Sequence, residues 1–171
     1  TKGGFNNGDV FITGSVGFGS NETFENKTDS FTFSPAVGKF FTSNIAAGLS
    51  LQYGSSKATN SISNVESKST TIGIAAFGRY YFTPTNKFSF FGHAEIGYVS
   101  TDLEVYKVNG FGIALAPGIS YFVSSNLALE ASFGLLSYTS VKPDFEGADS
   151  YSNFNLGVDM TQVKLGMIYK F

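Results

Sequence analysis

Five ionisable side chains lie in stretches that are otherwise built from apolar and small residues. They are the groups of this chain best equipped for chemistry, namely Arg79, His93, Glu95, Glu130 and Lys164. An isolated charge in a protein interior is very costly, so such groups are expected to pair with one another. We therefore predict a structural network of charges in the interior. The alternative is a narrow, gated path for ions lined by the same groups.

His93 is the only histidine, and cysteine is absent. A Ser-His-Asp device would have to be built around this one imidazole, and thiol chemistry, disulfides and cysteine-based zinc sites are excluded. The local sequence His93-Ala94-Glu95 has no serine two residues after the histidine. We predict that the chain is not an enzyme and that it has no cofactor.

Two other patterns resemble ligand-binding motifs, one for a metal ion and one for phosphate, but neither has the spacing or context of such a motif. Asp144, Glu146 and Asp149 lie close together, but their spacing is not that of a calcium-binding EF-hand loop, and a solvated acidic loop explains them. The glycines between Gly14 and Gly19 resemble a phosphate loop only in number, since no helix follows them. We expect no metal and no phosphate site at either place.

The elements that position these residues are strands. Apolar residues alternate with small or polar ones over about 9–19, 30–41, 45–53, 70–82, 88–98, 111–121 and 127–135, and again in a closing strand that ends at residue 171. The alternation of the closing strand slips near residues 159–161, which predicts a β-bulge. Short turns follow the second, fourth and sixth strands, and polar loops are expected at about 20–29, 55–68, 101–107 and 139–152. The 171 residues are predicted to form one domain, preceded by a short N-terminal segment over residues 1–8.

The composition indicates a membrane. Only 14% of the residues are charged, against roughly 25% in a soluble domain, and no apolar run reaches the 18 or more residues that a membrane-spanning helix requires. A chain of this kind must cross a bilayer as a closed barrel, which satisfies every backbone group. The large apolar face is expected to contact lipid, with Lys39 as its one basic residue. Aromatic girdles are expected from Phe41, Tyr53, Tyr80, Phe82, Tyr98, Tyr121 and Tyr169.

The opposite face consists mainly of Gly, Ala, Ser and Thr, which suits the filled interior of a small barrel. Large Phe91 and Phe122 on this face favour a filled interior over an open channel. The predicted fold class is therefore all-β, an eight-stranded antiparallel up-and-down transmembrane β-barrel. A soluble, lipocalin-like barrel with its faces reversed is the alternative architecture, and it predicts solubility without detergent.

Three segments carry a resemblance to a known family: Phe77–Phe82 (FGRYYF), Phe90–Tyr98 (FFGHAEIGY) and Leu165–Phe171 (LGMIYKF). With them, the chain resembles the OmpA/OmpX-type eight-stranded outer-membrane barrels, in particular the small porin-family domain of Bacteroidetes-like bacteria. The resemblance implies an outer-membrane location in a Gram-negative bacterium after removal of a signal peptide. It also implies that the closing strand is an assembly signal, formed by Val163, Leu165, Met167, Tyr169 and Phe171.

The resemblance specifies architecture better than function, because this fold supports many functions. We expect a structural or interaction role in the cell envelope. One form of this role is that of an accessory subunit in a larger outer-membrane complex. The alternatives are a small passive channel and a lipid-modifying barrel enzyme. The implied partners are outer-membrane lipid and lipopolysaccharide, the barrel-assembly machinery and other outer-membrane proteins. A net charge of −2 argues against nucleic acid.

The four expected loops are acidic. They hold five lysines and nine acidic residues, a balance of 5 − 9 = −4, whereas Lys39, Lys87 and Lys170 belong to the other end. An acidic rim suits contact with the medium, divalent cations or a partner, and simple solvation explains it equally well.

Overall fold

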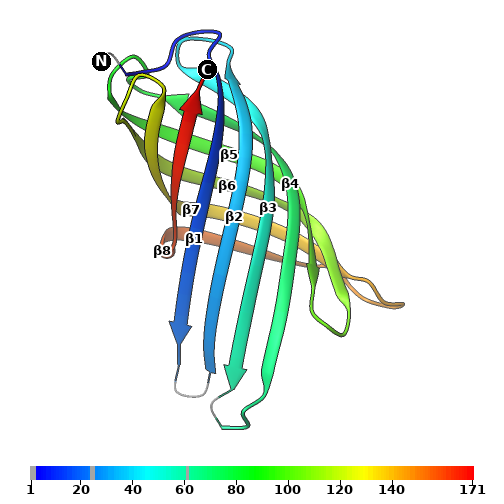
Figure 1. The fold of residues 1–171 in the computed structure, drawn as a ribbon. Helices are drawn as coiled ribbons and strands as arrows, with labels where there is room; N and C mark the ends of the chain where they lie inside the picture. Colours follow the sequence, from blue (N-terminus) through cyan, green and yellow to red (C-terminus); the bar gives the residue numbers. More distant parts are fainter. Residues whose placement is uncertain (1–2, 24–25, 61) are drawn as a thin grey trace.

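Eight strands, hydrogen-bonded to one another in chain order, close into a barrel in the computed structural model of the chain (Figure 1). The structure describes residues 3–23, 26–60 and 62–171, apart from the side chains of residues 159–162. The strands are β1 (Val10–Glu22), β2 (Asn26–Phe40), β3 (Ile45–Asn60), β4 (Glu66–Tyr81), β5 (Phe88–Asp102), β6 (Lys107–Phe122), β7 (Leu127–Pro143) and β8 (Tyr151–Lys170). Every neighbouring pair is antiparallel, which confirms the predicted up-and-down barrel. Among the described residues, no helix is long and apolar enough to cross a membrane.

The barrel has two unlike ends. The short connections 41–44, 82–87 and 123–126 lie at the same end as both chain termini, and we call this the turn end (Figure 1). The connections that follow β1, β3, β5 and β7 lie at the opposite end, the loop end. In outer-membrane barrels, short turns face the periplasm and the other end faces the medium.

The strands reach farther toward the loop end than the sequence predicts. The expected loops at 20–29 and 55–68 are wrong over most of their length, because Ser20 still pairs with Asp29 and Lys57 still pairs with Lys68. The loops expected at 101–107 and 139–152 shrink to 103–106 and 144–150. Membrane crossing takes about 9–11 residues per strand, whereas β3 and β4 have 16 each. Most of the additional residues are polar on both faces, as expected of a wall that extends beyond a bilayer, and their backbones continue to pair.

The outer wall is apolar and the inner wall is small or polar. Leu49, Leu51, Ile72 and Ile74 are each more than half exposed, while the residues between them line the interior. The seven aromatic residues predicted to form girdles are all exposed, by 45% to 64%. A wall with large apolar side chains outside fits a bilayer and not water, so the soluble alternative does not describe this barrel.

The bulge predicted near residues 159–161 is confirmed as a change of register between β7 and β8. Gly134 pairs with Asp159, but Ser132 pairs with Lys164, so β8 holds extra residues between these two pairs. The register of β7 with β8 changes again between Gly134 and Leu136, which pairs with Leu156. A third change lies between β6 and β7, where Leu115 pairs with Leu136 and Gly118 with Ser132. Figure 1 shows β8 bending away from β1 on its way to the loop end.

Candidate functional site

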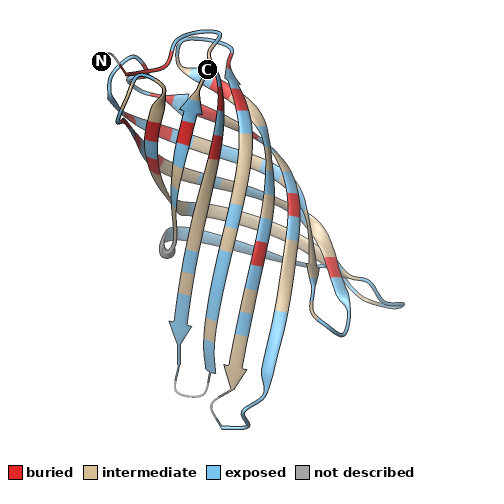
Figure 2. Cartoon of the chain, in the orientation of Figure 1, coloured by how far each residue is buried: buried red, intermediate tan, exposed pale blue. Residues whose placement is uncertain are grey.

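The interior of the turn end is filled by aromatic rings. We call this cluster the floor; it consists of Phe5, Phe11, Phe40, Tyr81, Phe91 and Phe122, each at most 2% exposed. The ring of Phe5 lies at its centre, with ring centroids 4.6 Å from Phe40, 4.8 Å from Phe122 and 5.1 Å from Tyr81. Figure 2 shows the buried residues gathered mostly at this end. The floor therefore closes the barrel at its turn end.

Phe5 reaches the floor from outside the strands. The segment before β1 folds across the turn end, where the Phe5 amide donates a hydrogen bond to the Pro84 carbonyl oxygen (2.7 Å). The Lys170 ammonium donates to the Gly4 carbonyl oxygen (2.6 Å) and lies 3.3 Å from an Asp9 carboxylate oxygen. These contacts hold residues 3–9 across the turn end, and we call these residues the stopper segment. The residues before β1 show no alternation of apolar and polar side chains, so the sequence did not indicate that Phe5 is part of the core. The only feature that could have indicated it is a single large aromatic residue in a glycine-rich segment.

Glycines on the inner wall make room for the floor rings. A Cβ at Gly38 would overlap the Phe11 ring, and one at Gly118 would overlap the Phe91 ring. Large and small side chains alternate in this way when they fill a narrow barrel. The predicted inward orientation of Phe91 and Phe122 is confirmed by their burial.

Arg79 is the centre of a charged layer above the floor. Its Nη1 lies 2.7 Å from Glu130 Oε2, and the two side chains are only 9% and 6% exposed. Arg79 Nη1 also donates to the Tyr81 hydroxyl (3.3 Å), and its guanidinium carbon lies 4.9 Å from the centroid of the Phe91 ring. Glu130 accepts a further hydrogen bond from the Thr13 hydroxyl (2.9 Å). The ion pair thus joins β4 to β7 across the lumen and is hydrogen-bonded on both sides.

His93 extends this layer to Glu95. Arg79 Nε donates to His93 Nδ1 (3.0 Å), and His93 Nε2 lies 3.3 Å from Glu95 Oε2. This geometry fits a neutral imidazole with its proton on Nε2, which accepts from one neighbour and donates to the other. The ring stacks on Phe77 with a centroid distance of 5.4 Å. Both ring nitrogens are therefore engaged by charged neighbours, and neither has a hydroxyl partner among the described residues.

Lys164 completes the five predicted residues. It lies on β8 opposite Gly17 and lines the same cavity as the other four. The structure therefore places all five at one interior surface, although the hydrogen bonds given above connect only Arg79, His93, Glu95 and Glu130 among them.

A cavity of about 590 Å³ lies above the charged layer. Its wall is mixed: glycine and apolar residues alternate with hydroxyl and amide groups, which include those of Thr13, Ser15, Thr32, Ser34, Ser50 and Gln52. It extends toward the loop end as far as Ser20 and Thr28 on β1 and β2. Floor, charged layer and cavity together make a cup that is closed at the turn end.

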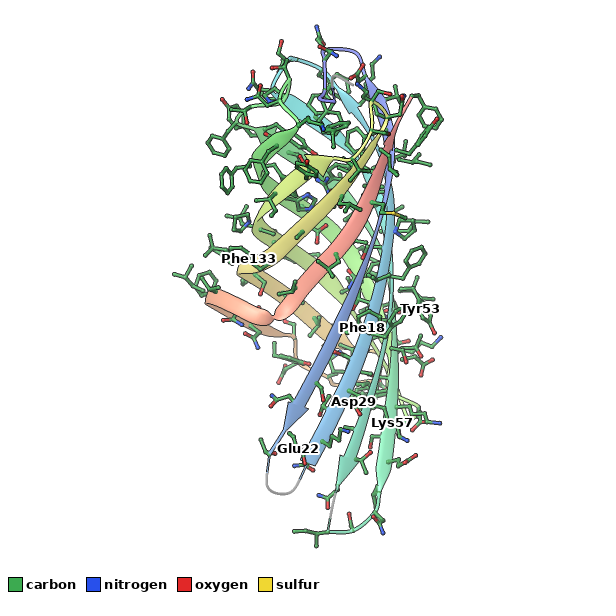
Figure 3. The ribbon with its side chains drawn as sticks, turned by 60° about the vertical axis from the view of Figure 1, so that its left-hand side comes forward. Phe18, Glu22, Asp29, Tyr53, Lys57 and Phe133 are labelled. Atoms are coloured by element: carbon green, nitrogen blue, oxygen red, sulfur yellow. The ribbon has the colours of Figure 1, made fainter. Side chains whose placement is uncertain are left out.

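The rim at the loop end carries paired charges. Lys57 and Glu66 lie 2.7 Å apart, Lys27 and Asp29 3.6 Å. Figure 3 shows Glu22, Asp29 and Lys57 at this end. The hydrogen bond and the charge of the Lys57 ammonium lower the pKa of the Glu66 carboxyl. Asp144, Glu146 and Asp149 are exposed in the connection before β8, and the described residues contain no cluster of three or more potential ligands for a metal ion.

The alternate residues of the closing strand face outward. Leu165, Met167, Tyr169 and Phe171 are 45% to 67% exposed, and the rings of Tyr169 and Phe171 pack edge to face at 5.2 Å. Val163, the first residue of the predicted assembly signal, is half-buried. A continuous apolar surface thus runs along the end of β8.

Comparison with known proteins gives the same architecture. The model of a family described as "Outer membrane protein beta-barrel domain" matches residues 2–171. The crystal structure of the outer membrane protein OprG from Pseudomonas aeruginosa is similar, with a TM-score of 0.62, 13% identity and coverage of 98% of each chain. That of Neisserial surface protein A is similar with a TM-score of 0.51 and 14% identity, covering 95% of this chain and 97% of the other. At these identities the two structures show a shared fold alone. No curated protein matches the sequence.

Proposed function

Since the chain belongs to the outer membrane protein β-barrel domain family, we propose that this outer-membrane barrel has a structural or interaction role in the cell envelope and does not conduct. The observation that carries the proposal is the floor. Six aromatic side chains, each at most 2% exposed, fill the turn end. Solutes that enter the cup from the medium meet packed rings, which leave no room for water.

The passive channel is the competing function. Its best support is the cavity of about 590 Å³, which has hydroxyl and amide groups on its wall and charged groups at its base. The Arg79–Glu130 pair stands in the path just above the floor, and opening it would leave two buried charges without partners. The contacts of the stopper segment favour a permanent seal over a gate.

We expect the unmodified protein to give no conductance steps in planar lipid bilayers. The triple variant Phe5→Ala/Phe40→Ala/Phe122→Ala removes three floor rings and is expected to give reproducible steps, because water then reaches the turn end. Phe90→Ala is the matched control, since Phe90 is 58% exposed on the outer wall of β5, and it should remain silent. The folded state of each variant is verified by comparing boiled and unboiled samples on an SDS gel, where a folded barrel changes its electrophoretic mobility on boiling. Steps from the unmodified protein would refute the sealed-barrel proposal.

Catalysis on lipid is the other alternative. A catalytic histidine would have to reach lipid and activate a hydroxyl. His93 instead lies in the interior between Arg79 and Glu95. This placement supports a role for His93 in the charged layer.

The proposed partners follow from two outer surfaces of the barrel, the apolar wall as a whole and the exposed end of β8. The apolar outer wall contacts the acyl chains of outer-membrane lipid and lipopolysaccharide, and other outer-membrane proteins can pack on the same wall. The exposed residues Leu165, Met167, Tyr169 and Phe171 are proposed to be recognised by the barrel-assembly machinery before the barrel closes.

Phe171→Ala is expected to lower the amount of folded barrel in the outer membrane several-fold in cells. The stability of the purified barrel should change little, because Phe171 is 67% exposed and packs mainly on Tyr169. The control is Phe82→Ala, an equally exposed aromatic at the turn end (63%), which should not affect assembly. For each variant, the amount of folded barrel is measured on an SDS gel of the outer-membrane fraction, as the intensity of the band that changes its mobility when the sample is boiled. Equal amounts of the two variants would contradict an assembly role for the last residue.

A further inference from the structure

The outer wall is hollowed over β8, β1, β2 and β3, which lie side by side in Figure 1. The hollow is an open groove of about 1060 Å³ that includes Gly14. Gly14 belongs to the outward set of β1 and is paired with Pro35 of β2 and Met167 of β8. The larger outward side chains around it include Ile12, Val16, Phe33, Val37, Leu49 and Leu165. The groove therefore arises where one residue of the outward face has no side chain.

The groove has the length of one leaflet of the bilayer. It runs from Ile12 to Val16 on β1 and from Val37 to Phe33 on β2. Each of these spans is four residue steps, or about 13 Å at the rise of a strand. The hydrocarbon core is about 30 Å thick, so one leaflet contributes about 15 Å. Because Ile12 and Val37 lie toward the turn end, the groove belongs to the periplasmic leaflet.

Lys39 lies at the turn-end edge of the groove. It is the next outward residue of β2 after Val37, and it is paired with Val10 of β1 and Ala47 of β3. Its side chain is exposed, and no carboxylate of the described residues lies within ion-pair distance of its ammonium group. A lysine near the end of a membrane-spanning segment extends its ammonium group to the headgroup region. An apolar groove and an unpaired cation thus lie next to each other along β2.

This combination matches the two parts of a phospholipid, an acyl chain and a phosphate. Phospholipids form the periplasmic leaflet of an outer membrane, whereas lipopolysaccharide forms the other leaflet and carries its phosphates far from Lys39. A membrane-spanning helix is about 30 Å long and would extend well beyond the groove. A second barrel would approach with a convex wall and leave the hollow at Gly14 empty. The length, position and charge of the groove therefore favour a phospholipid.

We infer that the groove binds one phospholipid with a net negative headgroup, with an acyl chain lying against Gly14 and the phosphate beside the Lys39 ammonium group. A zwitterionic headgroup brings its own ammonium group, which competes with Lys39 for the phosphate. One lysine at the membrane surface corresponds to a preference of about fivefold for the anionic lipid. The inference rests on the proposed role as an outer-membrane barrel, and it names a lipid that the apolar wall retains.

Native mass spectrometry tests the inference. The purified barrel is transferred from detergent with equal amounts of phosphatidylglycerol and phosphatidylethanolamine that have the same acyl chains. We expect complexes of one chain with one lipid, with phosphatidylglycerol retained about fivefold more often. Lys39→Gln should abolish this preference. Gly14→Leu should lower the retention of both lipids several-fold, because a Cβ at Gly14 meets only the Phe33 ring, at 3.7 Å, and the longer side chain fills the groove.

Each variant has a matched control. Lys87→Gln removes another lysine of the turn end, whose ammonium lies 5.8 Å from the centroid of the Tyr121 ring and outside the groove. Gly92→Leu adds the same side chain on the outer wall of β5, where a Cβ meets nothing within 4 Å. Both controls should retain lipid as the unmodified protein does. A change of mobility on boiling verifies that all four variants are folded.

Three results would overturn the inference: equal retention of the two lipids by the unmodified protein, the same preference in Lys39→Gln and Lys87→Gln, or the same retention in Gly14→Leu and Gly92→Leu. A mass of two chains without lipid would overturn it as well, since a second copy would then cover the groove. Failure to retain lipid together with silent bilayers would leave the sealed barrel intact. Conductance steps from a barrel that retains phosphatidylglycerol would refute only the seal, so the two proposals fail separately.

Discussion

Replacing Glu130 with alanine is expected to lower the free energy of unfolding by about 3–5 kcal/mol, the cost of leaving one partner of a buried ion pair alone. Arg79 would keep its charge in a site where its side chain is only 9% exposed. The hydrogen bond from the Thr13 hydroxyl to Glu130 would be lost as well. The protein in lipid vesicles is incubated at increasing urea concentrations. At each concentration the folded fraction is measured on an SDS gel, as the fraction of the protein whose mobility changes on boiling.

Two further variants separate the charge effect from a general loss of packing. Glu66→Ala breaks an exposed ion pair with Lys57 at the rim and is expected to leave the unfolding midpoint unchanged, since surface pairs contribute little. The double variant Arg79→Leu/Glu130→Leu should recover most of the stability lost in Glu130→Ala, because apolar replacement of a buried pair is often neutral. A double variant as unstable as the single one would show that the shape of the layer, and not its unpaired charge, decides the stability.

Gly48→Ala is expected to destabilise the barrel by at least about 1–3 kcal/mol, the range for overpacking a filled core. A Cβ at Gly48 would overlap the Val37 carbonyl oxygen and the Cα of Gly38 on β2. Both are backbone atoms, so relief requires moving a strand and not a side chain. We expect a lower unfolding midpoint in the same urea series and a smaller yield of folded barrel.

Gly78→Ala is the matched control, because an added Cβ at Gly78 meets nothing within 4 Å. Both glycines lie in central parts of neighbouring strands, and Gly78 is opposite Ala47, the residue before Gly48. Alanine also suits a strand slightly better than glycine, so Gly78→Ala should be neutral or weakly stabilising. Equal losses in the two variants would mean that the close approach at Gly48 does not limit the packing.

Local alternation was sufficient to predict the strands and their faces. Whether Leu49 or Ser50 faces outward depends only on adjacent residues in an extended chain, so a period of two can be recognised without knowing any partner strand. The same rule placed Phe91, Phe122 and the five ionisable residues in the interior. It failed at 20–29 and 55–68, because polar residues on both faces of a strand have no alternation to detect, although their backbones pair.

The sequence by itself thus determined an eight-stranded barrel for a membrane, with apolar residues outside and charged groups inside. Only the tertiary structure decided which groups meet. Arg79 pairs with Glu130, 51 residues away, because the stagger of the strands around the barrel brings β4 and β7 to one level. Phe5 closes the floor although it belongs to no strand, and the ladder of β1 with β8 stops at Gly17, opposite Lys164, where the register of β8 with β7 also changes. These features depend on contacts between residues far apart in the chain, and the physical reason is that a local pattern sets the face of a residue but not its neighbour across the barrel.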